Sequence, residues 1–210
     1  MSETSATTDT GRSPAKRRAI LQAASKVFVR EGYKGASVDS IAAAAGVAKQ
    51  TVYGHFGNKE QLFLAVVEQA RNSGGIGPER LATLIADTGD ARTDLEAAGE
   101  RLLRAITSPE QAALHRLTIA EAPLHPELQR SWRDDGATPA IAVVAAYLTA
   151  CVARGELSMP DPARAARQFT ILLSAEGQVR SLRGLQQLTD SELRDIARDT
   201  TDLIIRAYRP

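Results

Sequence analysis

The chain has 210 residues, 43% of them hydrophobic, and a formal net charge of +1. This length suits one or two domains, and the composition is that of a globular protein with a sizeable core. The single cysteine, Cys151, excludes an intramolecular disulfide and a thiolate metal cluster, and no apolar run approaches the ~18 residues of a membrane span. We expect a cytoplasmic protein that uses no metal or cofactor.

Charge is unevenly distributed along the chain. Residues 1–75 contain ten Lys/Arg and six Asp/Glu, a charge of +4, and the remainder contains sixteen and nineteen, a charge of −3. A basic N-terminal part joined to a mildly acidic body is typical of an anion-binding module. Residues 1–13 are polar, lack the apolar segment of a signal peptide and are expected to form a disordered tail.

Four helices are predicted next. The first spans residues 14–31, carries an apolar stripe and ends at Gly32, which is placed to adopt a left-handed conformation. The second begins after its N-cap Ser37. The third spans residues 48–56, and the fourth follows its N-cap Asn58.

The second and third of these helices have the pattern of a helix-turn-helix. Ala42 is small enough for a close helix crossing, and Gly46 tolerates the tight turn between the helices. The residues expected to face inward are Ile41, Ala45, Val47 and Val52. The outer face then carries Ala48, Lys49, Gln50, Thr51, Tyr53 and His55. Most of these side chains are polar and suit base edges and phosphates in a major groove, which predicts a DNA-reading helix.

Helix signals continue beyond a predicted boundary loop at residues 72–77. Hydroxyl or carboxylate N-cap residues are predicted at Thr93, Ser108, Thr138, Asp161 and Thr189. They indicate helices near 93–106, 108–121, 138–154, 161–182 and 189–208, with two further short helices at 78–88 and 125–134. Since β-strand patterns are missing, the predicted fold class is all-α: an N-terminal helix-turn-helix domain followed by a larger helical domain.

Residues 14–70, which include "SVDSIAAAAGVAKQTVYGHFGNKEQLF", resemble the DNA-binding domain of the TetR (tetracycline-repressor) family of bacterial regulators. The resemblance implies a DNA-binding domain at residues 14–71 and a homodimer that reads a palindromic operator in double-stranded DNA. The DNA-binding residues that it implies are Arg17, Arg18, Ser37, Lys49, Gln50, Thr51, Tyr53, His55 and Lys59.

These residues divide by their implied roles. Lys49, Gln50 and Thr51 occupy positions that meet base edges or the nearby backbone, and the other six are implied to contact phosphates or the DNA backbone. A solvated lysine at Lys49 and a core aromatic at Tyr53 are the alternative interpretations. The sequence departs from the common family pattern at Ala48, where many members have Ser or Thr, and at Gly54, where a larger residue is usual.

The segments "RLTIAEAPLHPELQRSWRDDG", "YLTACVARGEL" and "DPARAARQF" resemble the C-terminal domain of the AefR-like regulators within the same family. This implies a ligand-binding and dimerisation domain at residues 78–210. The candidates for a ligand pocket are His115, Glu121, Trp132, Tyr147, Cys151 and Gln168, each of which could instead have an ordinary core or surface role. The candidates for the dimer interface are Phe169, Leu172, Leu173, Glu176, Leu203 and Ile204, whose stripes could instead pack within one subunit.

The expected function is a sequence-specific transcriptional regulator, a repressor that a small-molecule effector releases from its operator. The alternative is an architectural or partner-controlled DNA-binding protein without such an inducer. An enzyme is not expected, because the sequence has no nucleophile–base pair and no HExxH motif.

Overall fold

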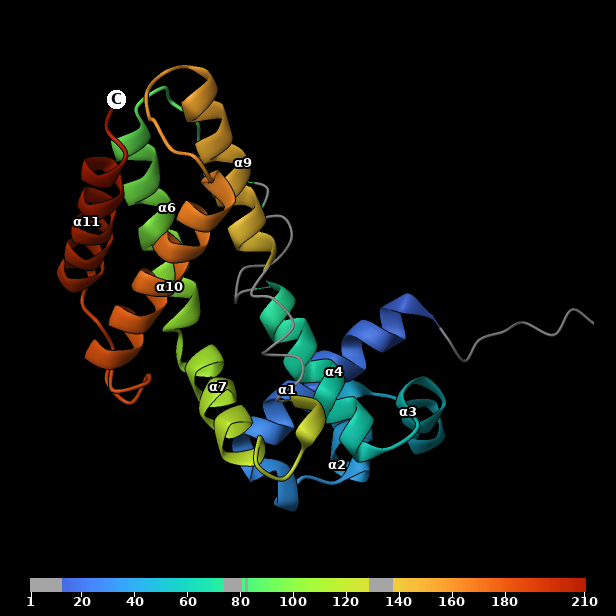
Figure 1. Ribbon diagram of the computed structural model, residues 1–210. Helices are drawn as coiled ribbons and strands as arrows, with labels where there is room; N and C mark the ends of the chain where they lie inside the picture. Colours follow the sequence, from blue (N-terminus) through green and yellow to red (C-terminus); the bar gives the residue numbers. More distant parts are fainter. Residues whose placement is uncertain (1–12, 74–80, 82, 129–137) are drawn as a thin grey trace, which may run out of the picture. The chain divides into compact units, whose positions relative to one another are not determined.

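The computed structural model describes residues 13–73, 81, 83–128 and 138–210 (Figure 1). Among these residues all regular structure is helical and no strand occurs, which confirms the predicted all-α class. The helices are α1 (Pro14–Gly35), α2 (Val38–Ala45), α3 (Lys49–Phe56), α4 (Lys59–Ser73), α6 (Ala91–Ile106), α7 (Pro109–Glu121), α9 (Pro139–Ala153), α10 (Pro162–Arg180) and α11 (Asp190–Ala207).

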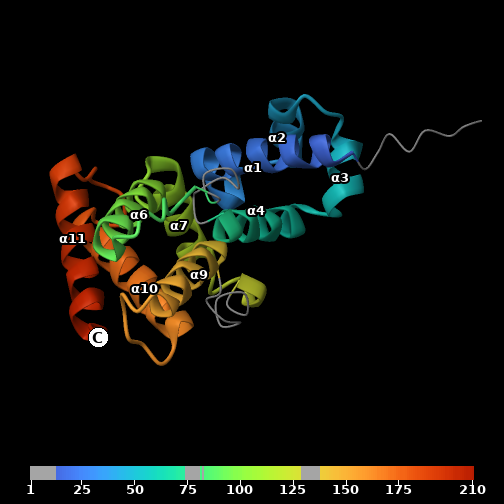
Figure 2. The same cartoon turned by 90° about the horizontal axis from the view of Figure 1, so that it is seen from above.

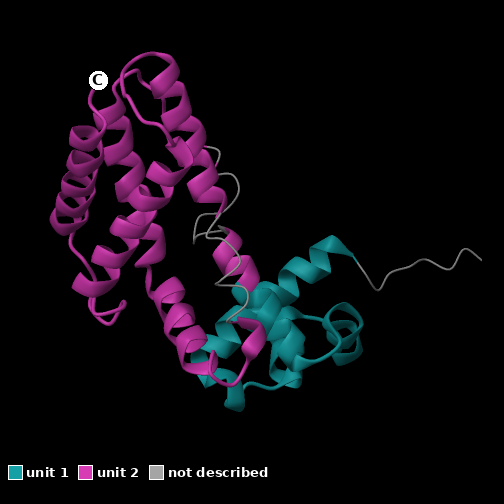
Figure 3. Cartoon of the chain, in the orientation of Figure 1, with its two compact units in different colours: residues 1–67 teal, residues 68–210 magenta. Residues whose placement is uncertain are grey.

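The chain divides into two compact units, residues 1–67 and residues 68–210 (Figure 3). The boundary falls within α4, so this helix begins in the first unit and ends in the second. Several predicted segments lie largely or partly outside the described residues: the tail, the boundary loop and the short helices at 78–88 and 125–134. Residues 83–88 are described and are not helical, so the prediction of a helix is wrong there, whereas residues 126–128 are helical as predicted. None of the described helices is long and apolar enough to cross a bilayer.

The first unit is organised around α1. The predicted apolar stripe is buried, with Phe28 fully enclosed. The ring of Phe28 packs edge-on against Phe63 of α4 at 5.1 Å between centroids, and Tyr33 lies 5.0 Å from Phe63. Gly32 has the predicted positive φ, 72°, but the helix is kinked there and continues to Gly35. Asn58 caps α4 as predicted, because its Oδ1 accepts from the backbone N–H of Gln61 at 2.8 Å.

In the second unit, α10 packs against α6, α9 and α11, and α6 packs along α11 (Figure 1; Figure 2). A single apolar core lies between these helices, and it includes Leu95, Leu103, Leu148, Phe169 and Leu173. The burial of these side chains is the main source of stability for a helical bundle, since each fully buried leucine or phenylalanine contributes roughly 1.5–3 kcal/mol relative to an exposed one.

The caps of the second unit follow the sequence with two exceptions. Ser108 stands at the N-cap position of α7 as predicted, but its side chain makes no capping hydrogen bond. Thr138 and Asp161 cap α9 and α10, and Thr189 forms a capping box with Glu192, all as predicted. The prediction that Thr93 begins a helix is wrong. The N-cap of α6 is Asp90, whose carboxylate accepts from the backbone N–H groups of two first-turn residues and so satisfies two otherwise unpaired donors.

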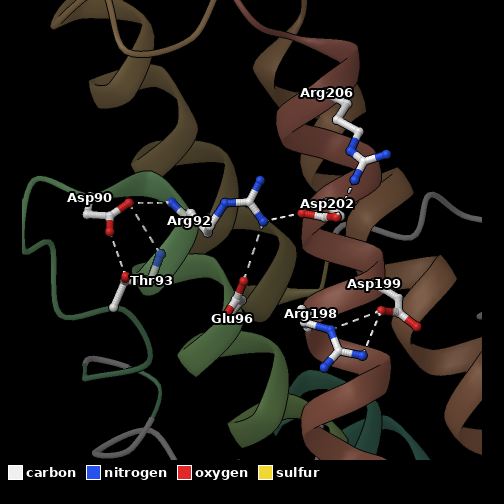
Figure 4. A network of polar contacts seen from close by, with 8 residues as sticks. All are labelled: Asp90, Arg92, Thr93, Glu96, Arg198, Asp199, Asp202 and Arg206. Atoms are coloured by element: carbon white, nitrogen blue, oxygen red, sulfur yellow. Dashed lines mark hydrogen bonds and ion pairs between the residues drawn. The ribbon is translucent and has the colours of Figure 1, made fainter.

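Charged side chains join α6 to α11 along their exposed edge (Figure 4). Arg92 of α6 pairs with Asp202 of α11, and also lies 3.6 Å from Glu96. Arg206 pairs with the same Asp202 at 2.9 Å. The hydrogen bond from Arg92, with the positive charges nearby, holds the pKa of Asp202 below its ordinary value. Because these charged groups are partly exposed to solvent, we expect each pair to contribute little to stability.

Candidate nucleic-acid interface

The turn between α2 and α3 has the geometry that a helix-turn-helix requires. Gly46 adopts φ 65° and ψ 35°, the left-handed conformation that a glycine reaches without steric cost. Ile41 and Ala42 of α2 and Val52 of α3 are buried where the two helices cross, whereas Val47 is half-buried. The inward residues therefore hold the third helix at a fixed angle on the second.

The start of α2 is capped as predicted. The Ser37 hydroxyl accepts from the backbone N–H of Ser40 at 3.0 Å, and the Ser40 side chain accepts from the backbone N–H of Ser37 at 3.3 Å. Ser37 itself is exposed, and its hydroxyl also donates to the Ser40 hydroxyl at 3.1 Å. The capping role of Ser37 is thus confirmed, and its phosphate contact stays a prediction.

The outer face of α3 is polar and open to solvent. Lys49 and Gln50 are exposed, and the Tyr53 side chain is 43% exposed although it is aromatic. Thr51 is half-buried. The apolar side of the same helix is formed by Val52 and Phe56, and both are buried. The exposed face is therefore not needed to pack α3 against the rest of the unit. This arrangement rules out the interpretation of Tyr53 as a core aromatic.

Other predicted contact residues surround this face. Arg17 and Arg18 of α1 are exposed, and the Arg17 guanidinium lies over the ring of Phe56 at 5.2 Å, so α1 delivers a positive charge to the end of α3. His55 is half-buried, and its Nε2 is buried without a hydrogen-bond partner among the described residues. That nitrogen is therefore withdrawn from solvent, which does not favour the predicted phosphate contact of His55.

Lys59 has a different environment from the one that its position suggested. Its Nζ donates to the backbone carbonyl oxygens of Tyr33 at 2.9 Å and Ala36 at 3.0 Å, and lies 4.7 Å from the centre of the Tyr33 ring. These carbonyls belong to the end of α1 and the link to α2, where a cation is favoured by the helix dipole. Lys59 therefore ties the start of α4 to the α1–α2 connection, and only part of its hydrogen-bonding capacity is left for a phosphate.

Comparisons with known proteins agree with this geometry. The family model of the bacterial regulatory proteins of the tetR family matches residues 20–66, and that of the AefR-like transcriptional repressor C-terminal domain matches residues 93–210, more than half of the chain. The chain belongs to the TetR family. This membership confirms the predicted class of a DNA-binding transcriptional regulator.

Individual TetR-family relatives differ in how far they match. The chain is 32% identical to the DNA-binding transcriptional repressor TetR of Mycobacteroides abscessus, over 66% of this chain and 68% of that protein. It is 48% identical to the transcriptional activator FasR of Mycolicibacterium smegmatis, but over only 26% of this chain and 25% of FasR. A solved TetR-family structure from Mesorhizobium loti aligns over 95% of this chain and 100% of its own, with 30% identity and a TM-score of 0.82.

The pocket candidates of this TetR-family member fall in different environments. Tyr147 and Cys151 lie one turn apart in α9 and belong to the buried core. Gln168 is exposed and accepts a hydrogen bond from Tyr208 at 3.5 Å, which does not fit an internal pocket. Trp132 lies outside the described residues.

Two pocket candidates remain on α7, and both are half-buried. Burial, together with the positive charge of Arg183, lowers the pKa of His115, although a hydrogen bond with Gln178 acts in the opposite sense. The carboxylate of Glu121 lies 3.7 Å from the ring of His125. A lining role for His115 and Glu121 stays a prediction.

The dimer candidates separate into two groups. Phe169, Leu173 and Ile204 are at most 4% exposed within a single chain. The prediction that they form a dimer surface is wrong, because they already pack in their own core. Leu172 is 42% exposed and Leu203 60% exposed, and Glu176 is also exposed, so these three remain available to a partner.

Sequence reasoning missed two carboxylates that the structure makes prominent. Asp39 of α2 pairs with Lys49 of α3 at 2.8 Å. Asp94 of α6 is 2% exposed and accepts hydrogen bonds from Tyr147 and Thr88. The sequence signal for Asp94 was its place in the otherwise apolar stripe of α6, next to Leu95.

The environment of Lys59 leads to a stability prediction. Lys59→Met is expected to lower the free energy of unfolding by about 2 kcal/mol, because two partly buried carbonyl oxygens lose their donor. Lys26→Met, which removes an exposed lysine of α1, is the charge-matched control and should change stability by less than about 0.5 kcal/mol. Urea unfolding measures both. Unchanged stability, with a slope of log affinity against log salt that flattens by about 0.9, would mean that Lys59 acts mainly on phosphate.

Proposed function

We propose that this TetR-family protein binds a palindromic operator as a homodimer and represses transcription until a small molecule releases it. The observation that carries the DNA-reading role is the exposed polar face of α3, formed by Lys49, Gln50 and Tyr53 opposite the buried Val52 and Phe56. Recognition helices of this kind enter the major groove and read base edges with their N-terminal residues. A cytoplasmic location follows from this role.

The exposed aliphatic side chains of the last two helices support the homodimer. Leu172 and Val179 are seven residues apart on α10 and so share a face, and Val179 is 68% exposed. On α11, Leu203 is also exposed. Exposed apolar side chains on one helix face favour a protein partner, and a second copy supplies the two-fold symmetry that a palindrome needs.

The proposed effector would bind the second unit. A ligand changes DNA affinity only if it binds differently to the DNA-competent and the DNA-incompetent states. A neutral imidazole at His115, favoured by its lowered pKa, suits a hydrogen bond to an uncharged ligand. Repression as the sign of regulation is supported by the repressor from Mycobacteroides abscessus, which matches more of this chain than does the activator FasR.

Selection of random duplexes by the purified protein, followed by sequencing, tests the proposal. We expect an inverted repeat whose two halves are about one helical turn apart, or a multiple of it. Size-exclusion chromatography with light scattering should show a dimer in the same buffer. Retention without sequence enrichment, or a monomer on the selected duplex, would contradict the proposal.

Tyr53→Phe is expected to weaken binding about tenfold on every duplex, because one hydrogen bond to a charged phosphate is lost. The preferred sequence should not change, since phosphate contacts carry no direct sequence information. Tyr208→Phe removes the same atom from the second unit and is the control. By contrast, Gln50→Ala should change the preferred sequence. Fluorescence anisotropy on selected and scrambled duplexes separates these results, and a changed preference in Tyr53→Phe would contradict the assignment.

A further inference from the structure

The DNA-facing side of the helix-turn-helix carries an ion pair. Nζ of Lys49, the first residue of α3, lies 2.8 Å from Oδ2 of Asp39, the second residue of α2. The side chains are 50% and 68% exposed, so both charged groups remain in contact with solvent. The pair therefore joins the N-terminal ends of the two helices at the surface that meets the groove.

Folding gives little reason for this pair. Exposed ion pairs contribute little to stability, because solvent screens them and both side chains lose freedom. The start of α2 is already capped by Ser37 and Ser40, and the packing of α2 on α3 rests on Ile41 and Val52. The helix dipole favours a carboxylate in the first turn of α2, but it does not require the contact with Lys49. The pairing of the two groups is therefore understood from what they face.

A carboxylate at a DNA interface lowers the affinity for any duplex, but it can also raise the preference for a particular base. It is repelled by phosphates at any sequence, and it neutralises a lysine that would otherwise bind the backbone. It is also the side-chain group that accepts from the amino group of cytosine in the major groove, while lysine donates to O6 and N7 of guanine. A donor and an acceptor held side by side, as in this pair, match the two adjacent base edges of one G·C pair.

We propose that Asp39 is a specificity-determining residue of the DNA interface, which acts with Lys49 to read one G·C base pair and to weaken binding to other sequences. The proposal rests on the DNA-reading function argued above. In the free protein Asp39 holds the Lys49 ammonium. On the operator, Asp39 accepts from the cytosine amino group while Lys49 donates to the guanine of the same base pair. On other duplexes the carboxylate finds no donor, and the repulsion remains.

The test uses the full-length chain and four proteins: wild type, Asp39→Ala, Lys49→Met and the double variant. Random-duplex selection gives the preferred sequence of each protein. Anisotropy titrations at several salt concentrations then give the affinity for the selected and the scrambled duplex. Asp199→Ala on α11 makes the same change in net charge in the other unit and is the control. Thermal unfolding checks that each variant is folded.

We expect Asp39→Ala, which removes both the charge and the acceptor, to bind the scrambled duplex more tightly and to lose about tenfold in discrimination at one G·C position of each half-site. The slope of log affinity against log salt on the scrambled duplex should steepen by about 0.9, because Lys49 becomes free to bind a phosphate. In the Lys49→Met background the same change at residue 39 should leave the slope unaltered. The control should behave as wild type.

Two results overturn the inference and can be told apart. If the wild-type protein selects an inverted repeat and Asp39→Ala, which has no acceptor at all, keeps the same preference and discrimination, Asp39 is only a favourable charge in the first turn of α2. If the wild-type protein selects no sequence at all, the DNA-reading function fails and the role of Asp39 fails with it.

Discussion

Replacing Gly184 with alanine is expected to lower the free energy of unfolding by about 4 kcal/mol. Gly184 lies between α10 and α11 and has φ +79°, which strains any residue with a Cβ atom. A Cβ atom there would also lie 2.0 Å from the Cβ of Ala112 in α7. Because the methyl group of an alanine cannot turn away, one helix would have to move.

Gly155→Ala is the matched control for this prediction. Gly155 has φ +76°, but a Cβ atom there would meet nothing within 4 Å. The control should therefore lose only the conformational part, about 1–2 kcal/mol. Urea unfolding measures the loss of stability in each variant. The difference between the two losses is the contribution of the contact with α7. Equal losses would show that the connection does not approach Ala112 closely in solution.

Removing the buried carboxylate in α6 is the second large effect. Asp94 accepts from the hydroxyl of Tyr147 at 2.7 Å, from the backbone N–H of Thr88 at 2.7 Å and from the Thr88 hydroxyl at 2.9 Å. Asp94→Ala is expected to cost about 3 kcal/mol, because it leaves the buried Tyr147 hydroxyl without an acceptor and opens a cavity.

Asp94→Asn is the conservative comparison. Its amide oxygen can replace Oδ2, and its NH₂ group can donate to the Thr88 hydroxyl, so the expected loss is about half that of alanine. Tyr147→Phe removes the donor of the same hydrogen bond. In a double-mutant cycle with Asp94→Ala, the stability loss of the double variant should therefore be smaller than the sum of the two single losses. Additive losses in urea unfolding would mean that the two groups stabilise the core independently.

The same carboxylate makes stability depend on pH. Burial raises the pKa of Asp94, but the hydrogen bonds from Tyr147 and Thr88 outweigh it, so the pKa lies below its ordinary value. A carboxyl group whose folded pKa is lowered adds stability above its unfolded pKa, and this stability is lost as the pH falls through the folded pKa. The stability of the wild type should therefore fall below about pH 4 more steeply than that of Asp94→Asn.

Features that depend on local chain geometry could be predicted from the sequence. Ser37, Asn58 and Thr189 cap their helices because the acceptor and the N–H groups that it serves lie within three residues. Even local patterns can be ambiguous by one turn, as at the start of α6. Both Asp90 and Thr93 could cap a helix there, and Asp90 prevails because its carboxylate also accepts from the Thr93 hydroxyl at 2.6 Å.

Features that depend on distant partners could not be predicted in the same way. The acceptors of Lys59 are 26 and 23 residues away, and the partner of Tyr147 is 53 residues away. Helical periodicity also places Leu172 and Leu173 on neighbouring strips of α10, yet one is exposed and the other lies in the core. Which strip faces inward depends on where the other helices pack, and no single segment contains that information.

The contact made by Lys59 places unequal constraints on its two ends. Its hydrogen-bond acceptors are main-chain oxygens, which every residue at positions 33 and 36 would provide. The donor is a side-chain amine, which only lysine supplies at that length and geometry. Selection for this contact would therefore act on residue type at position 59, and at position 33 only through the aromatic ring over which the ammonium lies, while residue 36 would vary as far as packing allows. The junction between α1 and α2 can thus change in sequence without losing its tie to α4.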